Sequence, residues 1–341
     1  MVNREIRERI NEERAKFILS LSEKQRCELI WNNETDKETN KGEPYYDQKT
    51  YLRNVVFYLK KQLANNCELV IEYNFSKKMR TDGRLFAQQF SLQSMKKNLR
   101  GFLIGGMFSS DQGGMYVEGG MDYCYKDYDM VNCHPSILSC ILLDYNVVDD
   151  DVDFKEQYPY LFNYTRSIKH RQDFLERADC TKQDILKMMN SSNRTTIFNE
   201  YTVGIDNEFK RIQKIIYDHT PNGLKQFEHF KGDERKPNKK GSFINKILCI
   251  VENKIINMVL EHYEEKYPFE NTTSTLMFDG LFITSELPDQ VDELNNITYD
   301  MGIEWAQKDL DDSIEKSQLY ENRNADDISK IKSKDYKTVK L

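Results

Sequence analysis

Long hydrophobic runs are missing from this sequence. A membrane-spanning helix needs roughly 20 consecutive apolar residues, and the 341-residue chain contains no such run. It also lacks the positively charged start followed by an apolar block that is typical of a signal peptide. We therefore expect a soluble protein that has no membrane partner and resides in the cytoplasm.

Cysteine, glycine and proline are present without a pattern that would indicate a special fold. The seven cysteines are scattered and odd in number, and no two of them form a C-x-x-C pair. This pattern argues against a disulfide framework and gives no sign of a zinc site. Fifteen glycines and seven prolines are too few for a low-complexity chain. We expect a globular protein of one or two domains in a reducing compartment.

An excess of positive charge is also lacking, because the formal net charge is -7. A nucleic-acid-binding protein, however, needs a basic groove rather than a basic total. Basic residues gather locally in three clusters, which are Lys77, Lys78, Arg80 and Arg84; Lys96, Lys97 and Arg100; and Lys231, Arg235, Lys236, Lys239 and Lys240. The second cluster lies on one predicted helix and is a candidate nucleic-acid-binding face. A solvated surface is the ordinary explanation of any single cluster.

Apolar residues recur at helical spacing over most of the chain, which predicts a helix-rich fold. The expected helices are 3–30, 49–65, 91–100, 158–177, 200–218, 243–265 and 288–301, with a further helix capped by Thr181. The expected strands are 68–75, 303–310 and a hairpin over 275–284. With 39% hydrophobic and 31% charged residues, the chain can form a packed core with much exposed helix surface.

The segment Tyr125–Leu142 points most directly to chemistry. An aromatic and apolar run ends on Asp129, a short polar turn follows, and Pro135 opens a helix, where its missing N–H is not needed. A strand that ends on a carboxylate can present it to a metal ion and a phosphate at a sheet edge. The alternative is an ordinary strand, turn and helix, in which Asp129 only marks the helix entry.

A second aspartate comes from the hairpin TLMFDGLFIT, whose two apolar arms meet at Asp279-Gly280. Asp-Gly is also a good turn by itself, and that explanation stays open. If the two strands are neighbours, Asp129 and Asp279 converge and can bind two divalent cations, Mg²⁺ or alternatively Mn²⁺. One cation would activate an attacking hydroxyl, and the other would hold a triphosphate, as phosphoryl transfer requires.

Basic side chains that could hold the phosphates lie between these two segments. Arg166, Lys169 and His170 are one turn apart on one predicted helix, and Lys187 lies on another. Arginine forks and lysine ammonium groups are common phosphate ligands. An exposed helix charge is the alternative for each of them taken singly.

The two aspartate segments resemble motifs of the family B DNA polymerases. Asp129 to Ile137 is similar to the first palm motif, in which an aspartate is followed at fixed spacing by Tyr-Pro-Ser-Ile, and His134 stands in the tyrosine's place. Asp279-Gly-Leu-Phe-Ile resembles the third motif and aligns with its second aspartate. The resemblance implies that the His134 ring lies under the incoming sugar and opposes a 2′-hydroxyl.

Two further stretches are similar to parts of the same family. Lys187-Met-Met-Asn190-Ser191 resembles the fingers motif, with one residue fewer between the lysine and the asparagine. Lys308 lies where the family keeps a lysine that contacts the primer–template duplex. The resemblance implies that Lys187 and Asn190 bind the nucleotide and that Lys308 binds nucleic acid.

The chain departs from the family pattern in several places. Met277 replaces the first of the two aspartates of the third motif, and the Tyr-Gly pair after the fingers motif is absent. No acidic pattern of a proofreading exonuclease is present, and the chain is far shorter than the family norm. The resemblance therefore implies a minimal, divergent palm polymerase of viruses or mobile elements, which would act in the host cell cytoplasm if viral.

The fold that we expect is α+β: a right-hand polymerase-like palm, in which an antiparallel sheet is backed by helices, with a helical fingers insertion. A mostly helical region should span 1–75, and the first half of the palm 76–150. The fingers-like region should span 151–241 and the second half of the palm 242–310. A polar, flexible tail should span 311–341.

The expected activity is template-directed nucleotidyl transfer, foremost DNA-dependent DNA synthesis from dNTPs on a primer–template, without proofreading. Other replication proteins are expected as further partners. A primase, an RNA-synthesising enzyme or a template-independent nucleotidyltransferase is the alternative on the same site, because His134 is smaller than tyrosine. A two-metal nuclease would need more acidic ligands and no triphosphate-binding lysines. A nucleic-acid-binding or assembly protein with a decayed palm is the non-catalytic alternative.

Overall fold

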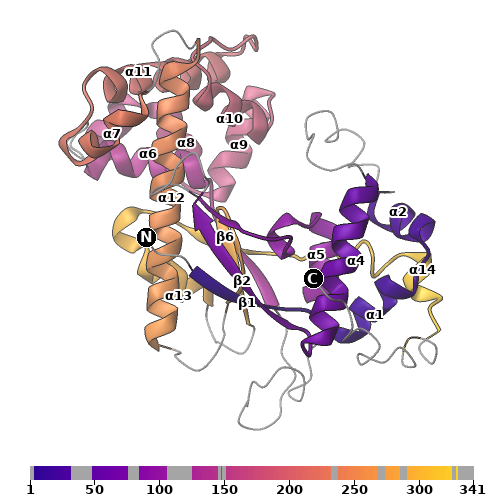
Figure 1. Ribbon diagram of the computed structural model, residues 1–341. Coiled ribbons are helices and arrows are strands. Elements are labelled where there is room, and N and C mark those ends of the chain that lie inside the picture. Colours follow the sequence, from indigo (N-terminus) through magenta and orange to yellow (C-terminus); the bar gives the residue numbers. More distant parts are fainter. Residues whose placement is uncertain are drawn as a thin grey trace.

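The fold combines helices with two antiparallel sheets (Figure 1). The computed structural model describes residues 4–31, 48–75, 84–105, 125–144, 147, 151–231, 237–266, 273–284, 290–324 and 328. Within these residues, no helix combines the length and the apolar character that crossing a membrane demands. The combination of helices with antiparallel strands agrees with the expected α+β class.

The first sheet has the strand order β1-β2-β3 and is antiparallel throughout. Its strands are β1 (Arg4–Arg9), β2 (Glu68–Phe75) and β3 (Leu85–Ala87). The helices of this part of the chain are α1 (Glu12–Ser20), α2 (Glu23–Trp31), α4 (Gln48–Ala64) and α5 (Lys97–Ile104), with the short η1 (Leu92–Ser94) before α5. They form one lobe of the molecule together with α14 (Figure 1).

Strand β1 corrects the prediction of one continuous helix over residues 3–30. Arg4, Ile6 and Glu8 are buried while the residues between them are exposed, which is the period of a strand. Two of these three buried residues are charged, so the alternation of apolar and polar residues is not visible in the sequence. Arg4 can be buried because its guanidinium donates to Asn257 Oδ1 at 3.0 Å on helix α12.

The second sheet has the strand order β5-β6-β4-β7 and is also antiparallel. Its strands are β4 (Tyr125–Met130), β5 (Thr273–Met277), β6 (Gly280–Thr284) and β7 (Trp305–Lys308). Strand β4 therefore lies between β6 of the hairpin and β7, which comes much later in the chain. Strand β1 contacts β5, so the two sheets adjoin.

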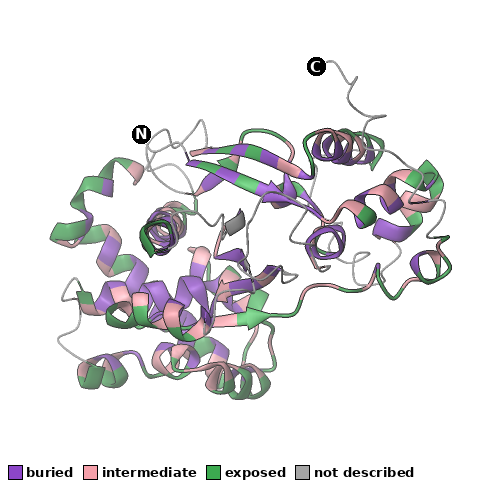
Figure 2. Ribbon diagram, turned by 90° about the horizontal axis from the view of Figure 1, so that it is seen from below, coloured by how far each residue is buried: buried purple, intermediate pink, exposed green. Residues whose placement is uncertain are grey.

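Two helices pack against each other beside this sheet. Helix α6 (Cys133–Asp144) begins two residues after β4 and is buried over most of its length, with Pro135 in its first turn as expected. Helix α12 (Lys239–Lys266) is the longest helix, and it runs from the helical lobe past the sheet (Figure 1). Figure 2 shows that buried residues line the inward sides of the helices and strands.

A helical lobe gathers around one end of α12 (Figure 1). It contains α7 (Asp151–Gln157), α8 (Pro159–Thr165), α9 (Ile168–Ala178), α10 (Lys182–Asn190), α11 (Glu200–Asp218) and η2 (Asn222–Phe230). The predicted single helix over 158–177 is two helices. Ser167 separates them because its side chain accepts the His170 N–H and caps α9. Thr181 caps α10 in a capping box, as expected.

The last elements are α13 (Gln290–Ile297), η3 (Tyr299–Met301) and α14 (Gln318–Glu321). The prediction of a flexible tail over 311–341 is wrong for the part that is described. Tyr320 is buried, and its ring contacts Phe17 and Phe102 edge-on, with centroids 5.0 and 4.9 Å away. Apart from Ile328, residues beyond 324 lie outside the described residues, as do Lys77, Lys78 and Arg80.

Glu8 joins the two sheets. Its buried carboxylate accepts hydrogen bonds from the Tyr58 and Tyr73 hydroxyls at 2.8 and 2.9 Å and from the Leu92 N–H at 3.0 Å. The Thr275 hydroxyl on β5 donates to it at 3.4 Å. Burial raises the pKa of Glu8 to about 7, although these hydrogen bonds pull it down. The N-terminal lobe and the β5–β6 hairpin therefore meet at one carboxylate.

Replacing Glu8 by glutamine should change how stability depends on pH. The folded protein holds the Glu8 proton up to about pH 7 and the unfolded chain only to about pH 4.5, so the wild type loses stability as pH rises between these values. The E8Q protein should lack this loss, up to about 1.4 kcal/mol per pH unit. Melting temperatures of both proteins between pH 5 and 8 measure it.

The glutamine should fit because its oxygen can face the Tyr58 hydroxyl and the Leu92 N–H, while its amide donates to the other two hydroxyls, which can rotate. Glu5→Gln on the exposed side of β1 is the matched control. Parallel melting curves for the wild type and E8Q across this pH range would contradict the prediction.

Candidate active site

Asp129 and Asp279 lie side by side at the end of the second sheet. The register of β4 and β6 pairs Asp129 with Gly280, and the Met130 N–H donates to the Asp279 carbonyl at 2.9 Å. The two strands are neighbours, which was the condition for bringing the two aspartates close together. Asp129 is at the penultimate position of β4 and Asp279 in the hairpin turn, so both residues belong to well-ordered backbone.

Gly280 is required by the closeness of these two strands. The hairpin turn consists of Phe278 and Asp279, and Gly280 is already the first residue of β6. The expected turn at Asp279-Gly280 is thus displaced by one residue. A Cβ added to Gly280 would overlap the Asp129 carboxylate and the Tyr128 carbonyl. Only glycine leaves enough space between the two strands here, and any larger residue would push the two aspartates apart.

Asp127 is a third carboxylate that the sequence analysis missed. It lies two residues before Asp129 on β4 and therefore on the same face of the sheet. The side chain is 7% exposed, and its Oδ1 atom is buried without a hydrogen-bond partner. Burial raises the pKa of Asp127, although the nearby cations Lys308 and Arg100 lower it. The spacing of two residues in a strand was the signal that could have identified it.

Three of the predicted nucleic-acid-binding cations lie at these carboxylates. Lys308 on β7 is opposite Asp127 in the register and forms an ion pair with Asp129. The Arg100 guanidinium lies 5.7 Å from the Phe282 ring on β6, and Lys97 is close enough to affect the pKa of Asp127. These three positive charges can balance three carboxylates.

Lys96 is the exception among the predicted nucleic-acid-binding residues. It precedes α5, and its ammonium group lies 5.4 Å from the Trp31 ring of the N-terminal lobe. The Lys96 backbone N–H donates to the Tyr51 hydroxyl at 2.8 Å. Lys96 and Lys97 thus have different neighbours, because Lys96 is the N-cap residue with an extended backbone (ψ 144°) and Lys97 is the first residue of the helix.

The three carboxylates suit a divalent cation. Carboxylate oxygens are the ligands that Mg²⁺ prefers in proteins. One Asp127 oxygen is buried and unpartnered, and Asp129 is bound by the Lys308 ammonium group. A cation already lies at this position, and the donor set contains oxygen alone. The donor chemistry of these residues therefore suits a hard cation such as Mg²⁺, but among the described residues the group whose ligand atoms lie within 4.8 Å of one another is a different one.

Cys133, His134 and Glu252 form a second group that could hold a metal ion, because one ligand atom from each lies within 4.8 Å of the others. Thiolate, imidazole and carboxylate are a ligand set more typical of zinc than of magnesium. Glu252 is also bound by Arg84, whose Nε and Nη2 atoms lie 2.5 and 2.9 Å from its two oxygens. A metal ion here would compete with that guanidinium. No spacing in the sequence indicates this group, because α12 contributes Glu252 far from Cys133.

The same network fixes the charge of His134. Its Nε2 atom lies 3.6 Å from Glu252 Oε2 and 3.3 Å from Arg84 Nη2. Burial alone would lower the pKa of His134, but hydrogen bonds to Cys249 and Glu252 raise it to about 9. Burial would conversely raise the pKa of Glu252, and the hydrogen bonds from His134 and Arg84 lower it. At neutral pH the carboxylate is therefore negative and the imidazole positive.

The turn between β4 and α6 is bound to the helical lobe through Asn132. This residue has a left-handed backbone with φ of 52°, which asparagine tolerates better than most residues. Its side-chain amide donates to the Tyr164 carbonyl at 3.2 Å, and its oxygen accepts from Arg171 Nη1 at 2.7 Å. The sequence analysis assigned no chemistry to Asn132 and did not single out Arg171.

The predicted phosphate ligands lie in the helical lobe. Arg166 follows α8 as its C-terminal cap, and Lys169 and His170 are in the first turn of α9. His170 Nδ1 lies 2.7 Å from the Ser167 hydroxyl, which also caps this helix. Lys187 on α10 is exposed and forms an ion pair with Asp184 at 3.2 Å.

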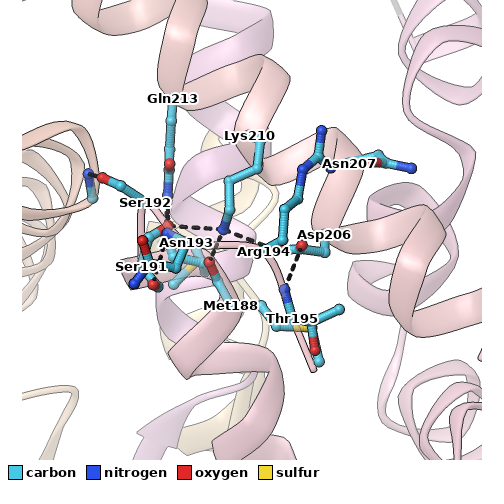
Figure 3. A network of polar contacts seen from close by, with 12 residues as sticks. Met188, Ser191, Ser192, Asn193, Arg194, Thr195, Asp206, Asn207, Lys210 and Gln213 are labelled. Atoms are coloured by element: carbon cyan, nitrogen blue, oxygen red, sulfur yellow. Dashed lines mark hydrogen bonds and ion pairs between the residues drawn. The ribbon is translucent and has the colours of Figure 1, made fainter. Parts of the chain in front are cut away.

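The predicted fingers motif ends in a polar network at the C-terminus of α10 (Figure 3). Lys210 Nζ donates to the Met188 and Ser191 carbonyls, both at 2.8 Å, and Gln213 Nε2 donates to the Ser191 carbonyl at 3.0 Å. Helix ends leave such carbonyls without partners and favour a cation. The Asn190 carbonyl accepts from Asn238, just before α12, at 2.9 Å. Helix α11 and the residue that precedes α12 thus hold the chain in place after Lys187.

Comparisons of the chain with protein-family models, curated proteins and solved structures found no match.

Replacing His134 by glutamine should lower stability in a pH-dependent way. Its pKa is raised from 6.5 to about 9, so its stabilising effect is complete below pH 6.5 and disappears as pH rises through 9. The H134Q protein should therefore melt below the wild type at pH 6.5, and the gap should close by about pH 10. The full effect is at most about 3 kcal/mol. His229→Gln on η2 is an exposed control, and a gap that stays constant with pH would contradict the assignment.

Proposed function

We propose that this protein is a template-directed nucleotidyltransferase with a palm-like active site, foremost a DNA-dependent DNA polymerase that uses Mg²⁺. One observation supports the proposal above all others. Asp129 and Asp279 come from segments far apart in the sequence, and the register of β4 and β6 places them together. Carboxylates on adjacent strands at a sheet end suit binding of a metal ion and a triphosphate.

The order of the elements supports the same function. A strand with the first aspartate leads into α6, a helical lobe follows, and α12 returns to a hairpin with the second aspartate. This is the order that the resemblance to family B polymerases implies for palm, fingers and palm. In this proposal β4 to β7 and the helices α6 and α12 form the palm, and α7 to α11 form the fingers.

Each residue of the site has a role that follows from its position. Asp129 and Asp279, with Asp127 beside them, would hold Mg²⁺, which when bound activates the attacking hydroxyl and neutralises the triphosphate. Lys308 holds the Asp129 carboxylate in place through their ion pair before the cation arrives. Once released from Asp129, the exposed Lys308 can contact a nucleic-acid phosphate.

The helical lobe would supply the cations for the triphosphate. Lys187 is exposed, and its ion pair with Asp184 of its own helix turn costs little to break at the surface. Arg166, which caps the end of α8, and Lys169 on α9 are exposed as well. The Arg171–Asn132 hydrogen bond connects this lobe to the turn after Asp129, so binding of phosphates in the lobe can change the position of the carboxylates.

Asparagine in place of Asp129 or Asp279 should abolish nucleotide incorporation, because a neutral amide binds Mg²⁺ poorly. We expect losses of at least about 10³-fold, equivalent to roughly 4 kcal/mol. The measurement is extension of a labelled primer on a template with Mg²⁺ and dNTPs. The Asp127→Asn protein should mainly need more Mg²⁺ for half-maximal extension.

Asp292→Asn on the exposed surface of α13 is the matched control and should retain activity. Melting temperatures exclude misfolding as the cause of any loss. Near-normal extension by both D129N and D279N would overturn the proposal, and shortened primers in place of extended ones would indicate a nuclease.

A second candidate function, RNA synthesis by the same site, is favoured by one observation. The residue in the family's sugar-excluding position is His134, and its ring is held by Glu252 and Arg84. An imidazole is smaller than a phenol, so less of the space under the incoming sugar is filled. Primase activity would follow if a 2′-hydroxyl is accepted there.

Replacing His134 by alanine should increase the use of ribonucleotides. Overlap with one hydroxyl costs about 1–3 kcal/mol when the surroundings can relax, so the wild type should prefer dATP over ATP by tens- to hundreds-fold. The H134A protein should lose most of this preference while dATP use falls less. Measuring kcat/KM for dATP and ATP with both proteins decides the matter. An unchanged ratio removes His134 from the sugar site, and a wild type that prefers ATP supports RNA synthesis.

A further inference from the structure

Two aromatic rings and an arginine lie immediately beside the aspartates. Phe278 is in the hairpin turn next to Asp279, and the centroid of the Phe86 ring on β3 lies 5.3 Å from that of Phe278. The guanidinium carbon of Arg84 lies 4.8 Å from the centroid of the Phe278 ring. We call Arg84, Phe86 and Phe278 the Phe278 cluster. Neither the carboxylate chemistry nor the phosphate ligands described above use it.

The Phe278 cluster is fixed by its contacts with Glu252 and with the hairpin backbone. Both oxygens of the buried Glu252 accept hydrogen bonds from Arg84, at 2.5 and 2.9 Å, which fixes the plane of the guanidinium group. Phe278 belongs to a turn whose next strand passes so close to β4 that only Gly280 fits. Rings fixed in this way lose little conformational freedom when a ligand binds.

The side chains of the Phe278 cluster are partly exposed to solvent. Phe86 is 38% exposed although its side chain is large and apolar, and Phe278 is only partly buried. The Arg84 side chain keeps 29% of its surface exposed. Single exposed apolar residues are common in proteins. Here, however, one exposed ring, a second ring and a fixed cation adjoin a carboxylate that is assigned to the reaction.

We propose that the Phe278 cluster stacks on a nucleobase of a bound nucleic-acid strand, next to the reacting end. This inference rests on the proposed nucleotidyl transfer, and it adds a binding site for the base itself. Every nucleobase offers a flat face to aromatic rings and to arginine, so such stacking tolerates any sequence. Arg84 on one side of Asp279, with Lys97 and Lys308 near Asp127, supplies positive charge for the phosphates on either side of that base.

Equilibrium binding of a labelled primer–template in EDTA tests the proposal without any turnover. The Phe86→Ala protein should bind about 5- to 150-fold more weakly, because stacking contributes about 1–3 kcal/mol per base. The dependence of binding on salt should stay as in the wild type, since no phosphate contact is lost. Lys308→Ala should instead lower the slope of log Kd against log salt by about one.

An abasic nucleotide placed at successive positions near the primer end identifies the stacked base. At that position the wild type should bind the abasic strand as weakly as F86A binds the intact strand. F86A with the abasic strand should lose no more affinity than either single change causes. Phe278→Leu keeps an apolar side chain in the turn and should show the same pattern. Phe198→Ala, at a ring that is 88% exposed in the helical lobe, is the matched control.

Two results would overturn the inference. One is wild-type affinity in both F86A and F278L, and the other is an equal loss of affinity for intact and abasic strands at every position. The second result would assign the rings to packing. Primer extension by the wild type separates this failure from a failure of the proposed function. If the protein extends primers but shows no stacking, only the role of the Phe278 cluster is wrong. If it shows stacking but does not extend primers, it is a nucleic-acid-binding protein and the proposed activity is wrong.

Discussion

The antiparallel pairing of β4 with β6 is the contact on which the rest of this structure depends. One backbone hydrogen bond, from Met130 to Asp279, and the absence of a side chain at Gly280 bring two carboxylates together. The neighbouring strands then add the other parts of the site. Strand β7 contributes Lys308 to the carboxylates, and β5 leads into the turn that carries Phe278. A slip of one residue in this pairing would turn every one of these side chains to the opposite face.

Buried carboxyl groups connect this sheet to the rest of the molecule. Glu8 joins β5 to the N-terminal lobe, and Glu252 joins α12 to Arg84 and to His134 at the start of α6. A buried carboxylate is costly unless several donors satisfy it, and both of these have at least three polar neighbours. Such networks specify one arrangement of the helices and sheets, because any other arrangement leaves a charge without partners.

Local pattern explains which parts could be predicted from the sequence. Helix α11 and the β5–β6 hairpin follow from periodicity and turn chemistry, and the neighbourhood of Asp129 and Asp279 follows from two strands that both end on an aspartate. Strand β1 was missed because its alternation includes buried charged residues, whose partners lie far away in the sequence. Glu252 was missed for the same reason, because its burial depends on partners such as Arg84, which only the folded chain brings near. Asp127, by contrast, could have been identified from its spacing of two residues from Asp129 in a strand.

The hydrogen bonds of Asn132 have a mechanical consequence. Its side chain holds the Tyr164 carbonyl and the Arg171 guanidinium of the helical lobe, while its backbone continues directly from the strand that carries Asp129. A swing of the helical lobe must therefore either break both hydrogen bonds or drag the end of β4 along. Because β4 also pairs with β6 on one side and β7 on the other, Asn132 joins the helical lobe to a strand whose position is already fixed. The placement of the lobe and the placement of the Asp129 backbone therefore depend on each other through one side chain.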